Sequence, residues 1–410
     1  MRHPKCSDSI PNTKTTPAAR TTATSVGSRV SDRPATIAAP RSCPGARRGA
    51  GIMGAMQHTT TRPRINVSDP ISVIMPVRNE EAHLATSVQG VLDQNYPGDL
   101  EILLAVGPSS DRTAEIARGL AQDNPHIRVI DNPSGTTPDA LNLAIAASRF
   151  PVVVRVDAHG ELGEDYLRTA VELLHSTDAA NVGGRMEARG RTSFERAVAL
   201  AYNSRLGLGG GGFHLAETPQ GPAETVFLGC FRRDALITAG GYDPAMIRAQ
   251  DWELNLRLRQ SGEKVIYSPR LRVTYRPRSS VKALARQFYL TGKWRREVIR
   301  RHRDTASLRY LAPPATVAGI AVGTALAANR RLPAWLRTVG LMAPLGYAVV
   351  VGLGSQFGLE GADEVPVDRR TRAWLPLVLA IIHISWGVGF LRGLDRDERI
   401  RSDAAPRPAA

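Results

Sequence analysis

The sequence predicts an α/β protein with a doubly wound, mostly parallel sheet, followed by helices that cross a membrane. From residue 70 onward, apolar runs of strand length alternate with segments of helical periodicity, which is typical of parallel sheets. Nearer the C-terminus, residues 311–328, 338–354 and 373–391 are nearly free of charge and close to the length that spans a bilayer.

The first part of the sheet is expected to alternate four strands with three helices. The strands are expected at residues 71–77, 100–106, 127–130 and 152–157. The third helix is expected to have Thr137 as its N-cap and Pro138 at its first helical position. Ligands of such sheets bind beyond the carboxyl ends of the strands, so Asp157 lies at the expected binding edge.

The second part of the domain is expected to continue this alternation less regularly. A helix at 165–176 precedes a short strand in "DAANVGGRMEA", and Thr192 with Glu195 forms a capping box for a helix that reaches about residue 206. A strand and a helix follow in "TVFLGCFRRDALITAGGYD", and "QDWELNLRLRQSG" is a further helix. We therefore expect a domain over residues 69–278.

The formal net charge of +15 is unevenly distributed. Residues 1–68 carry eleven Lys and Arg and two acids, and residues 282–303 carry eight and one, so the rest of the chain is nearly neutral. This distribution argues against a nucleic-acid partner. Residues 1–68 lack hydrophobic periodicity and form an expected disordered basic tail, and residues 394–410 an expected polar tail. Cys6, Cys43 and Cys230 form no disulfide or zinc pattern, which fits a reducing compartment.

Residues 305–393 form the expected membrane region, with about three helices. The third segment has tryptophans near both ends, whereas the Ala- and Gly-rich first two could instead form a buried helical hairpin. Residues 279–304 precede them and place Val281, Leu284 and Phe288 on one face of a helix rich in Lys and Arg. This pattern indicates an amphipathic helix at an anionic membrane surface.

Asp157 and His159 follow the fourth strand at the spacing i and i+2. Side chains at this spacing on an extended segment point the same way, so both can contact one cation. A carboxylate oxygen and an imidazole nitrogen suit Mn²⁺ well and Mg²⁺ less well. From this segment alone, a metal site and an ordinary polar loop are equally compatible with the sequence.

Two further groups of residues have both a functional and an ordinary interpretation. Asp251 stands where a helix begins, so it is either an N-cap or a general base near the sheet edge. Gly207, Gly209 and Gly212 match G-x-G-x-x-G, but no strand precedes them and no helix follows. We therefore expect a mobile loop near the active site there and no dinucleotide site.

Five motifs in order resemble the family 2 glycosyltransferases of the GT-A fold, in particular the membrane-associated, succinoglycan-type bacterial branch. The resemblance covers about residues 70–300. The motifs are "ISVIMPVRNEE", "SSDRT", "GTTPDALNLA", "VDAH" at the family's D-x-D position and "QDWEL" at its E-D-x-(E/D)-L element. The family's opening turn, glycine-containing loop and helix, and its D-x-D position, imply donor-binding roles for Pro76, Val77, Arg78, Asn79, Glu80, Gly135, Asn142 and Asp157, with Ala140 also matching the helix motif.

The resemblance implies an inverting, metal-dependent hexosyltransferase. Asp157 and His159 would hold Mn²⁺ or Mg²⁺, and Asp251 would be the general base. The donor would be a UDP-sugar such as UDP-glucose. The acceptor would be a lipid-linked saccharide or a polysaccharide. The protein would be a multi-pass protein of the cell membrane with its catalytic domain on the cytoplasmic side, acting in exopolysaccharide or cell-envelope synthesis.

The sequence departs from the family pattern at two places. Val106 and Gly107 stand where the family has an acidic pair, whose first carboxylate usually contacts the uracil, so the base of the donor stays open. The Q-x-x-R-W motif of processive synthases is absent, since Gln287 and Trp294 are too far apart, which disfavours repeated polymerisation. Two other classes of protein remain compatible with the sequence: a nucleotidyltransferase with a similar sheet, and a catalytically inactive membrane scaffold.

Overall fold

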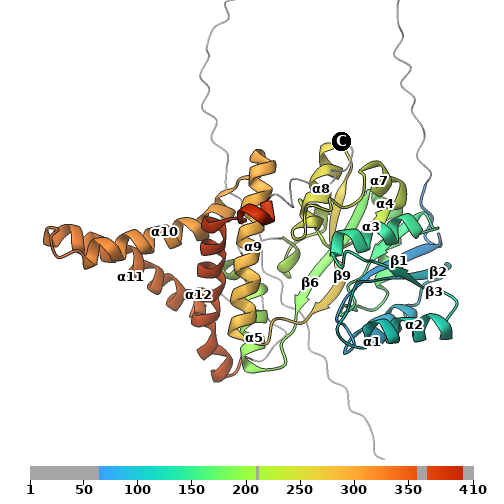
Figure 1. The fold of residues 1–410 in the computed structure, drawn as a ribbon, viewed down its shortest axis with the longest axis horizontal. Coiled ribbons are helices and arrows are strands. Elements are labelled where there is room, and N and C mark those ends of the chain that lie inside the picture. The colour runs from blue at the N-terminus through green and yellow to red at the C-terminus, as the bar shows by residue number, and fades with distance from the viewer. Residues whose placement is uncertain (1–63, 209–211, 358–366, 400–410) are drawn as a thin grey trace, which may run out of the picture. The chain divides into compact units, whose positions relative to one another are not determined.

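The computed structural model describes residues 64–208, 212–357 and 367–399 (Figure 1). Most of the expected disordered tail, most of the expected polar tail and the centre of the glycine-rich loop lie outside these ranges. Gly207, at the edge of that loop, belongs to a short helix, α6 (Arg205–Leu208).

The first part of the domain is the expected alternation of parallel strands and helices. Its elements are β1 (Ile71–Val77), α1 (Leu84–Leu92), β2 (Leu100–Val106), α2 (Thr113–Asp123), β3 (Ile127–Asp131), α3 (Thr137–Ala147) and β4 (Val152–Arg155). β1 lies between β2 and β4, and β3 pairs with the outer edge of β2, all in parallel. Their carboxyl ends therefore meet along one edge of the sheet.

The second part completes a mixed, mostly parallel sheet, which confirms the predicted fold class. Its elements are β5 (Glu161–Leu162), α4 (Tyr166–Thr177), β6 (Asn181–Ala188), α5 (Ser193–Tyr202), β7 (Gly221–Pro222), β8 (Phe227–Arg232), α7 (Arg233–Thr238), α8 (Gln250–Gln260) and β9 (Val265–Tyr275). The strand order is β3-β2-β1-β4-β8-β6-β9-β5, with β7 paired to β9. β8 is antiparallel to both β4 and β6, so the direction of the sheet changes beside β4.

Helices cover both faces of the sheet, with α1 and α2 on one side of it and α3 on the other (Figure 1). The first face buries Val73 and Met75 of β1 against α1, α2 and α4. The opposite face buries Ile74 of β1 against α3, α7 and α8. Burial of alternate strand residues on two faces explains why the strands read as continuous apolar runs.

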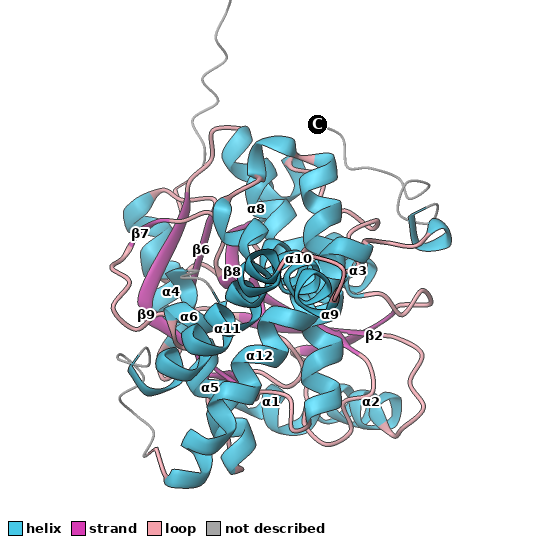
Figure 2. Cartoon of the chain, turned by 90° about the vertical axis from the view of Figure 1, so that its left-hand side faces the viewer, coloured by secondary structure: helices cyan, strands magenta, loops and turns pink. Residues whose placement is uncertain are grey.

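Four long helices follow the domain. They are α9 (Val281–Arg301), α10 (Leu308–Ala328), α11 (Ala334–Phe357) and α12 (Arg369–Arg392). The last three are long and apolar enough to cross a membrane, and only 11% of the apolar windows of α10 and α11 is buried within the protein. α10 and α11 pack against each other with Gly323 facing Gly340, and Figure 2 shows both helices in front of the sheet. Because so much of their apolar surface is uncovered, the alternative of a buried hairpin does not fit.

The apolar face of α9 contacts protein. Leu284 and Phe288 are buried in a cluster with residues of α5 and α12, whereas Val281 is 42% exposed. The placement of α9 at a membrane surface remains a prediction. Of the three apolar residues on which this prediction is based, Leu284 and Phe288 pack against α12.

Three local expectations differ from the structure. The N-cap of α3 is Thr136, whose side chain accepts from the Asp139 amide, because Thr137 is already helical. The strand expected to reach residue 157 ends at Arg155. The N-cap of α8 is Ala249, in the left-handed region at φ 61°, so Asp251 lies within the first turn and is no N-cap.

Candidate active site

The loops that follow β1, β2 and β3 are joined by Arg78. Its Nε donates to the Pro108 carbonyl at 3.1 Å, and its Nη1 donates to the Gly135 carbonyl at 3.1 Å. A Cβ on Gly107 would lie 3.1 Å from the Gly135 Cα, so the β2 and β3 loops approach too closely for a larger residue without displacement. This approach gives a physical reason for the glycine where the family has an acid.

The turn after β1 is held by the Ser109–Thr113 segment. Asn79 lies at φ 56°, and its Oδ1 accepts from the Ser110 amide at 2.9 Å. The Glu80 amide donates to Thr113 Oγ1 at 2.7 Å. These hydrogen bonds join the motif "ISVIMPVRNEE" to the motif "SSDRT", so residues of both motifs shape the turn after β1. They leave the predicted donor contacts of Asn79 and Glu80 as predictions.

Pro76 and Val77 lie within β1. The Val77 side chain is only 2% exposed, and its carbonyl accepts from the Gly107 amide at 2.8 Å. Val77 therefore supports the sheet edge from inside the core. Contacts of Pro76 and Val77 with the donor remain predictions. The buried side chain of Val77 is not accessible to a donor.

Arg155, at the end of β4, links the two aspartates that were predicted from different parts of the sequence. Its Nε and Nη2 donate to Asp157 Oδ1 at 3.1 and 3.0 Å, and its Nη1 donates to Asp251 Oδ1. The Arg155 side chain is 6% exposed, compared with 24% for Asp157 and 39% for Asp251. The structure thus brings Asp157 and Asp251 together on one buried cation.

The two carboxylates keep this guanidinium charged. Burial alone would lower the pKa of Arg155, but the charges of Asp157 and Asp251 outweigh it and raise the pKa well above its ordinary value. Removal from water raises the pKa of Asp251, and the Asp157 charge adds to this, while Arg155 opposes it. A carboxylate with a raised pKa and an accessible edge is suited to accept a proton.

His159 bonds to Glu80 across the edge of the sheet. Its Nδ1 lies 2.9 Å from Glu80 Oε1, and this hydrogen bond raises the pKa of His159, with burial opposing it and the Asp157 charge adding. A carboxylate on Nδ1 orients the ring and leaves Nε2 directed elsewhere. The structure therefore shows a Glu80–His159 pair that the sequence did not reveal.

The predicted metal ligands, Asp157 and His159, each keep one donor atom that is not bonded to Arg155 or Glu80. Within residues 64–208, 212–357 and 367–399, no group of three or more His, Cys, Asp or Glu forms a metal cluster. Arg155 occupies Oδ1 of Asp157, and Glu80 occupies Nδ1 of His159. Asp157 Oδ2 and His159 Nε2 remain as the candidate ligands. Two ligands suit Mn²⁺ or Mg²⁺ that is completed by substrate phosphates.

Asn142 holds the segment that leads into α8. Its Nδ2 donates to the Tyr242 carbonyl at 2.7 Å, and its Oδ1 accepts from the Tyr242 amide at 2.8 Å. Gly241 has φ +69°, and a Cβ there would lie 2.5 Å from Asn142 Oδ1. A donor contact of Asn142 stays a prediction. The contact that the structure shows positions the approach to Asp251.

Sequence reasoning missed Arg155 and Tyr242. Arg155 stands two residues before Asp157 in an otherwise apolar strand, so an unexplained charge in a buried run was the available signal. Tyr242 is fully buried beside Arg155 and Asp251, and no spacing in the sequence connects it to them.

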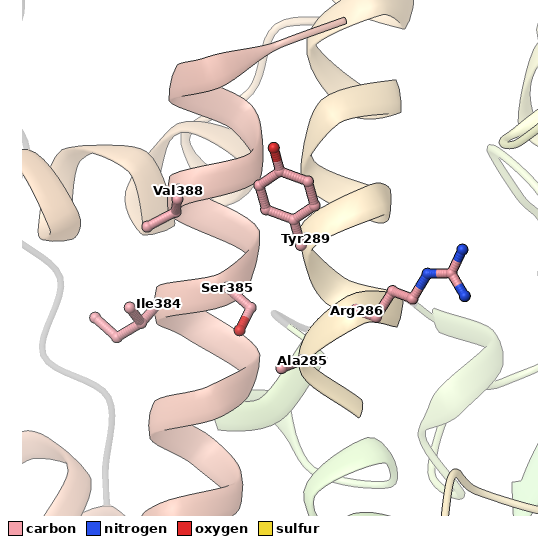
Figure 3. A pocket seen from close by; sticks show the side chains of 6 residues that line it. All are labelled: Ala285, Arg286, Tyr289, Ile384, Ser385 and Val388. Atoms are coloured by element: carbon pink, nitrogen blue, oxygen red, sulfur yellow. The ribbon is translucent and has the colours of Figure 1, made fainter. Parts of the chain in front are cut away.

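A separate groove lies between α9 and α12 (Figure 3). It has a volume of about 350 Å³ and is lined by Ala285, Arg286, Tyr289, Ile384, Ser385 and Val388. None of these side chains is a carboxylate or an imidazole. The guanidinium of Arg286 points away from α12 in this view.

Comparisons with known proteins show the family to which the chain belongs. The model of glycosyl transferase family 2 matches residues 72–237. The succinoglycan biosynthesis protein ExoA of Rhizobium meliloti (strain 1021) is 31% identical over 325 residues, which cover 78% of this chain and 94% of that protein. The chain belongs to glycosyltransferase family 2. It is a glycosyltransferase with a GT-A-like fold and a relative in exopolysaccharide synthesis.

Two further similarities are more distant. A dolichyl N-acetyl-alpha-D-glucosaminyl phosphate 3-beta-D-2,3-diacetamido-2,3-dideoxy-beta-D-glucuronosyltransferase of Methanococcus voltae is 26% identical, over 56% of this chain and 74% of that protein. The structure of a mannosyltransferase from Pyrobaculum calidifontis, in complex with GDP-Man and Mn²⁺, matches with a TM-score of 0.51 and 19% identity. It covers 81% of this chain and 91% of that chain, and it supports the fold alone.

Proposed function

We propose that this glycosyltransferase is anchored in the cell membrane and transfers a hexosyl group, with inversion, from a UDP-sugar to a lipid-linked or polysaccharide acceptor. The observation that carries the proposal is the Arg155 guanidinium, which joins Asp157 and Asp251 at the carboxyl edge of the sheet. One carboxylate would serve the donor side and the other the acceptor side of the same reaction centre.

Asp251 is the proposed general base. It would accept the proton of an acceptor hydroxyl while that oxygen bonds to the anomeric carbon and the bond from this carbon to the diphosphate breaks. Attack from the face opposite the departing diphosphate inverts the configuration, and no covalent intermediate is needed. The raised pKa of Asp251 supports this role, because it makes the carboxylate a stronger base.

Asp157 and His159 are the proposed ligands of Mn²⁺ or Mg²⁺. When bound, the ion would supply Lewis-acid stabilisation of the departing diphosphate. Glu80 would fix the His159 ring through Nδ1, and Arg155 would fix Asp157 through Oδ1. Arg78, Asn79 and Gly135 line the same edge and are the proposed contacts of the nucleotide. The donor base is the least constrained part, since Val106 and Gly107 stand where the family has its acidic pair.

The proposed acceptor and location follow from the C-terminal helices and one relative. Three helices long enough to cross a membrane follow the catalytic domain and α9. The name of the Methanococcus voltae relative describes a dolichyl phosphate-linked substrate. We place the catalytic domain on the cytoplasmic side of the cell membrane.

A panel assay tests this function. Membranes that contain the protein are supplied with UDP-glucose, other UDP-hexoses, GDP-mannose or nucleoside triphosphates, with Mn²⁺, Mg²⁺ or EDTA. Metal-dependent release of UDP from one UDP-hexose, together with labelled lipid or polysaccharide product, is expected. Pyrophosphate release from a triphosphate would instead identify a nucleotidyltransferase. No turnover of any donor would identify a scaffold.

A further inference from the structure

Arg295 of α9 is a buried cation with no counter-charge in contact. Its side chain is 9% exposed, its Nη1 is buried without a hydrogen-bond partner, and no ion pair to it occurs among the described residues. The guanidinium lies 4.7 Å from the Trp252 ring and 3.8 Å from the Tyr310 ring. Two aromatic faces offset only part of the desolvation of a guanidinium. The open Nη1 therefore points to an absent anion.

A second arginine contacts the same tyrosine. The Arg309 guanidinium lies 4.5 Å from the Tyr310 ring, donates to its hydroxyl, and pairs with Glu224 at 3.2 Å. Burial lowers the pKa of Arg295, and the Arg309 charge adds to this, so the two cations oppose each other. The side chain of Glu224, which pairs with Arg309, is 64% exposed.

Two further buried groups without a partner beside this cluster, the indoles of Trp252 and Trp386, are hydrogen-bond donors. Trp252 packs on Arg295, and Trp386 stacks on Tyr310 with ring centroids 6.5 Å apart. The indole Nε1 of each is buried and has no hydrogen-bond partner. Buried polar groups in native proteins are normally paired, so donors left open around two arginines fit a ligand that only accepts hydrogen bonds.

An apolar cavity adjoins the cluster. Its volume is about 720 Å³, and it lies between α6, α10, α11 and α12. Arg309 and Trp386 belong to its lining, and most of the remainder is aliphatic, such as Leu206, Ile320 and Val350. A phosphate group at the arginines would therefore have room for a hydrocarbon chain beside it.

We propose that Arg295 and Arg309 bind the phosphate of a lipid-linked acceptor, whose first hydrocarbon units occupy the cavity between α10, α11 and α12. This rests on the proposed function and assigns its acceptor site. Trp252, which packs on Arg295, is the residue after Asp251, so the site joins the membrane helices to the helix that carries the base. Glu224 holds Arg309 until the phosphate replaces it.

Binding of a long-chain polyprenyl phosphate to the full chain in nanodiscs tests the proposal, without donor or metal. The matching polyprenol lacks the phosphate, and phosphatidic acid carries a phosphate on two acyl chains. Charge-assisted hydrogen bonds predict that the polyprenyl phosphate binds at least tenfold more tightly than the polyprenol. Equal affinity for the two would overturn the phosphate site. Equal binding of phosphatidic acid would mean a site for membrane lipid and no acceptor site.

Three variants and one control complete the test. Arg295→Gln and Arg309→Gln should each lower the affinity for the polyprenyl phosphate about tenfold and leave the affinity for the polyprenol unchanged. Arg309 is the safer variant, since 30% of its side chain is exposed. Glu224→Gln should keep or increase the affinity, because it frees Arg309. Lys282→Gln removes an exposed charge from the same helix and should change nothing.

The outcomes separate this proposal from the proposed function. Phosphate-dependent binding without sugar transfer from any nucleotide would leave the site intact and refute the activity. If both Arg295→Gln and Arg309→Gln transferred sugar with the wild-type KM for the lipid acceptor, the phosphate site would be refuted. The proposed glycosyltransferase activity would then still hold.

Discussion

Arg155 donates two hydrogen bonds to one oxygen of Asp157, at 3.1 and 3.0 Å, and a third bond from the same guanidinium reaches Asp251. A residue from β4 thereby sets the position of a carboxylate on α8, 96 residues away in the sequence. The predictions below concern this connection and the contacts that support it.

Replacement of Arg155 by Met should separate the two carboxylates. Without the cation, Asp157 and Asp251 repel each other, and the expected result is a roughly hundredfold lower kcat with about 1 to 3 kcal/mol less stability. Assay of turnover and thermal inactivation in membranes measures both. The double variant Arg155→Met with Asp251→Asn should lose no more activity than Asp251→Asn alone, because the two residues act as one unit. Independent, additive losses would contradict the linkage.

Asp251→Asn should leave the donor bound and stop its transfer. The amide keeps the size of the side chain but cannot accept the proton, so kcat should fall by about 10³ or more. Titration calorimetry with the UDP-sugar identified by the panel assay should give a dissociation constant within threefold of wild type. Retained turnover would remove Asp251 from the role of base.

Glu80→Gln should weaken metal affinity through His159. The amide no longer holds the Nδ1 proton as a carboxylate does, and loss of such a partner lowers metal affinity about 10- to 100-fold. Mn²⁺ dependence of UDP release measures the shift. Glu115→Gln removes an exposed carboxylate that pairs with Arg112 and serves as the control.

Asp157→Ala tests the metal ligand directly. Donor binding that depends on Mn²⁺ should disappear in calorimetry, while binding without metal stays weak in both proteins. Unchanged affinity in the presence of Mn²⁺ would show that Asp157 holds no ion. Addition of EDTA to the wild type should reproduce the loss reversibly.

Gly241→Ala should disturb the segment before α8 more than the same substitution at another glycine of positive φ would. Its Cβ would press on Asn142 at 2.5 Å in addition to the cost of a positive φ, so about 2 kcal/mol or more of stability should be lost, with a lower kcat. Gly262→Ala is the matched control, since Gly262 has φ +86° with no atom within 4 Å. It should cost about 1 kcal/mol and leave kcat unchanged. Equal effects of both substitutions would mean that the Asn142 contact is unimportant.

Local sequence patterns were sufficient to locate most strands and helices. They also predicted that the binding edge lies at the carboxyl ends of the strands. They misplaced the starts of α3 and α8 by one or two residues, because Thr136 and Thr137 are equally able to cap and because Ala249 takes a left-handed conformation that its residue type does not signal. The three helices long and apolar enough to cross a membrane were evident from length and composition alone, since those properties need no partner.

The sequence by itself determined the family, the alternation that builds the sheet and the identity of Asp157, His159 and Asp251 as candidates. Only the tertiary structure decided that Arg155 joins two of them, that Glu80 holds the third, and that Asn142 supports the chain before α8. The physical reason is that periodicity reports which face of an element is buried. A hydrogen bond between residues about 80 to 100 positions apart depends on how whole elements pack, and no local pattern encodes it.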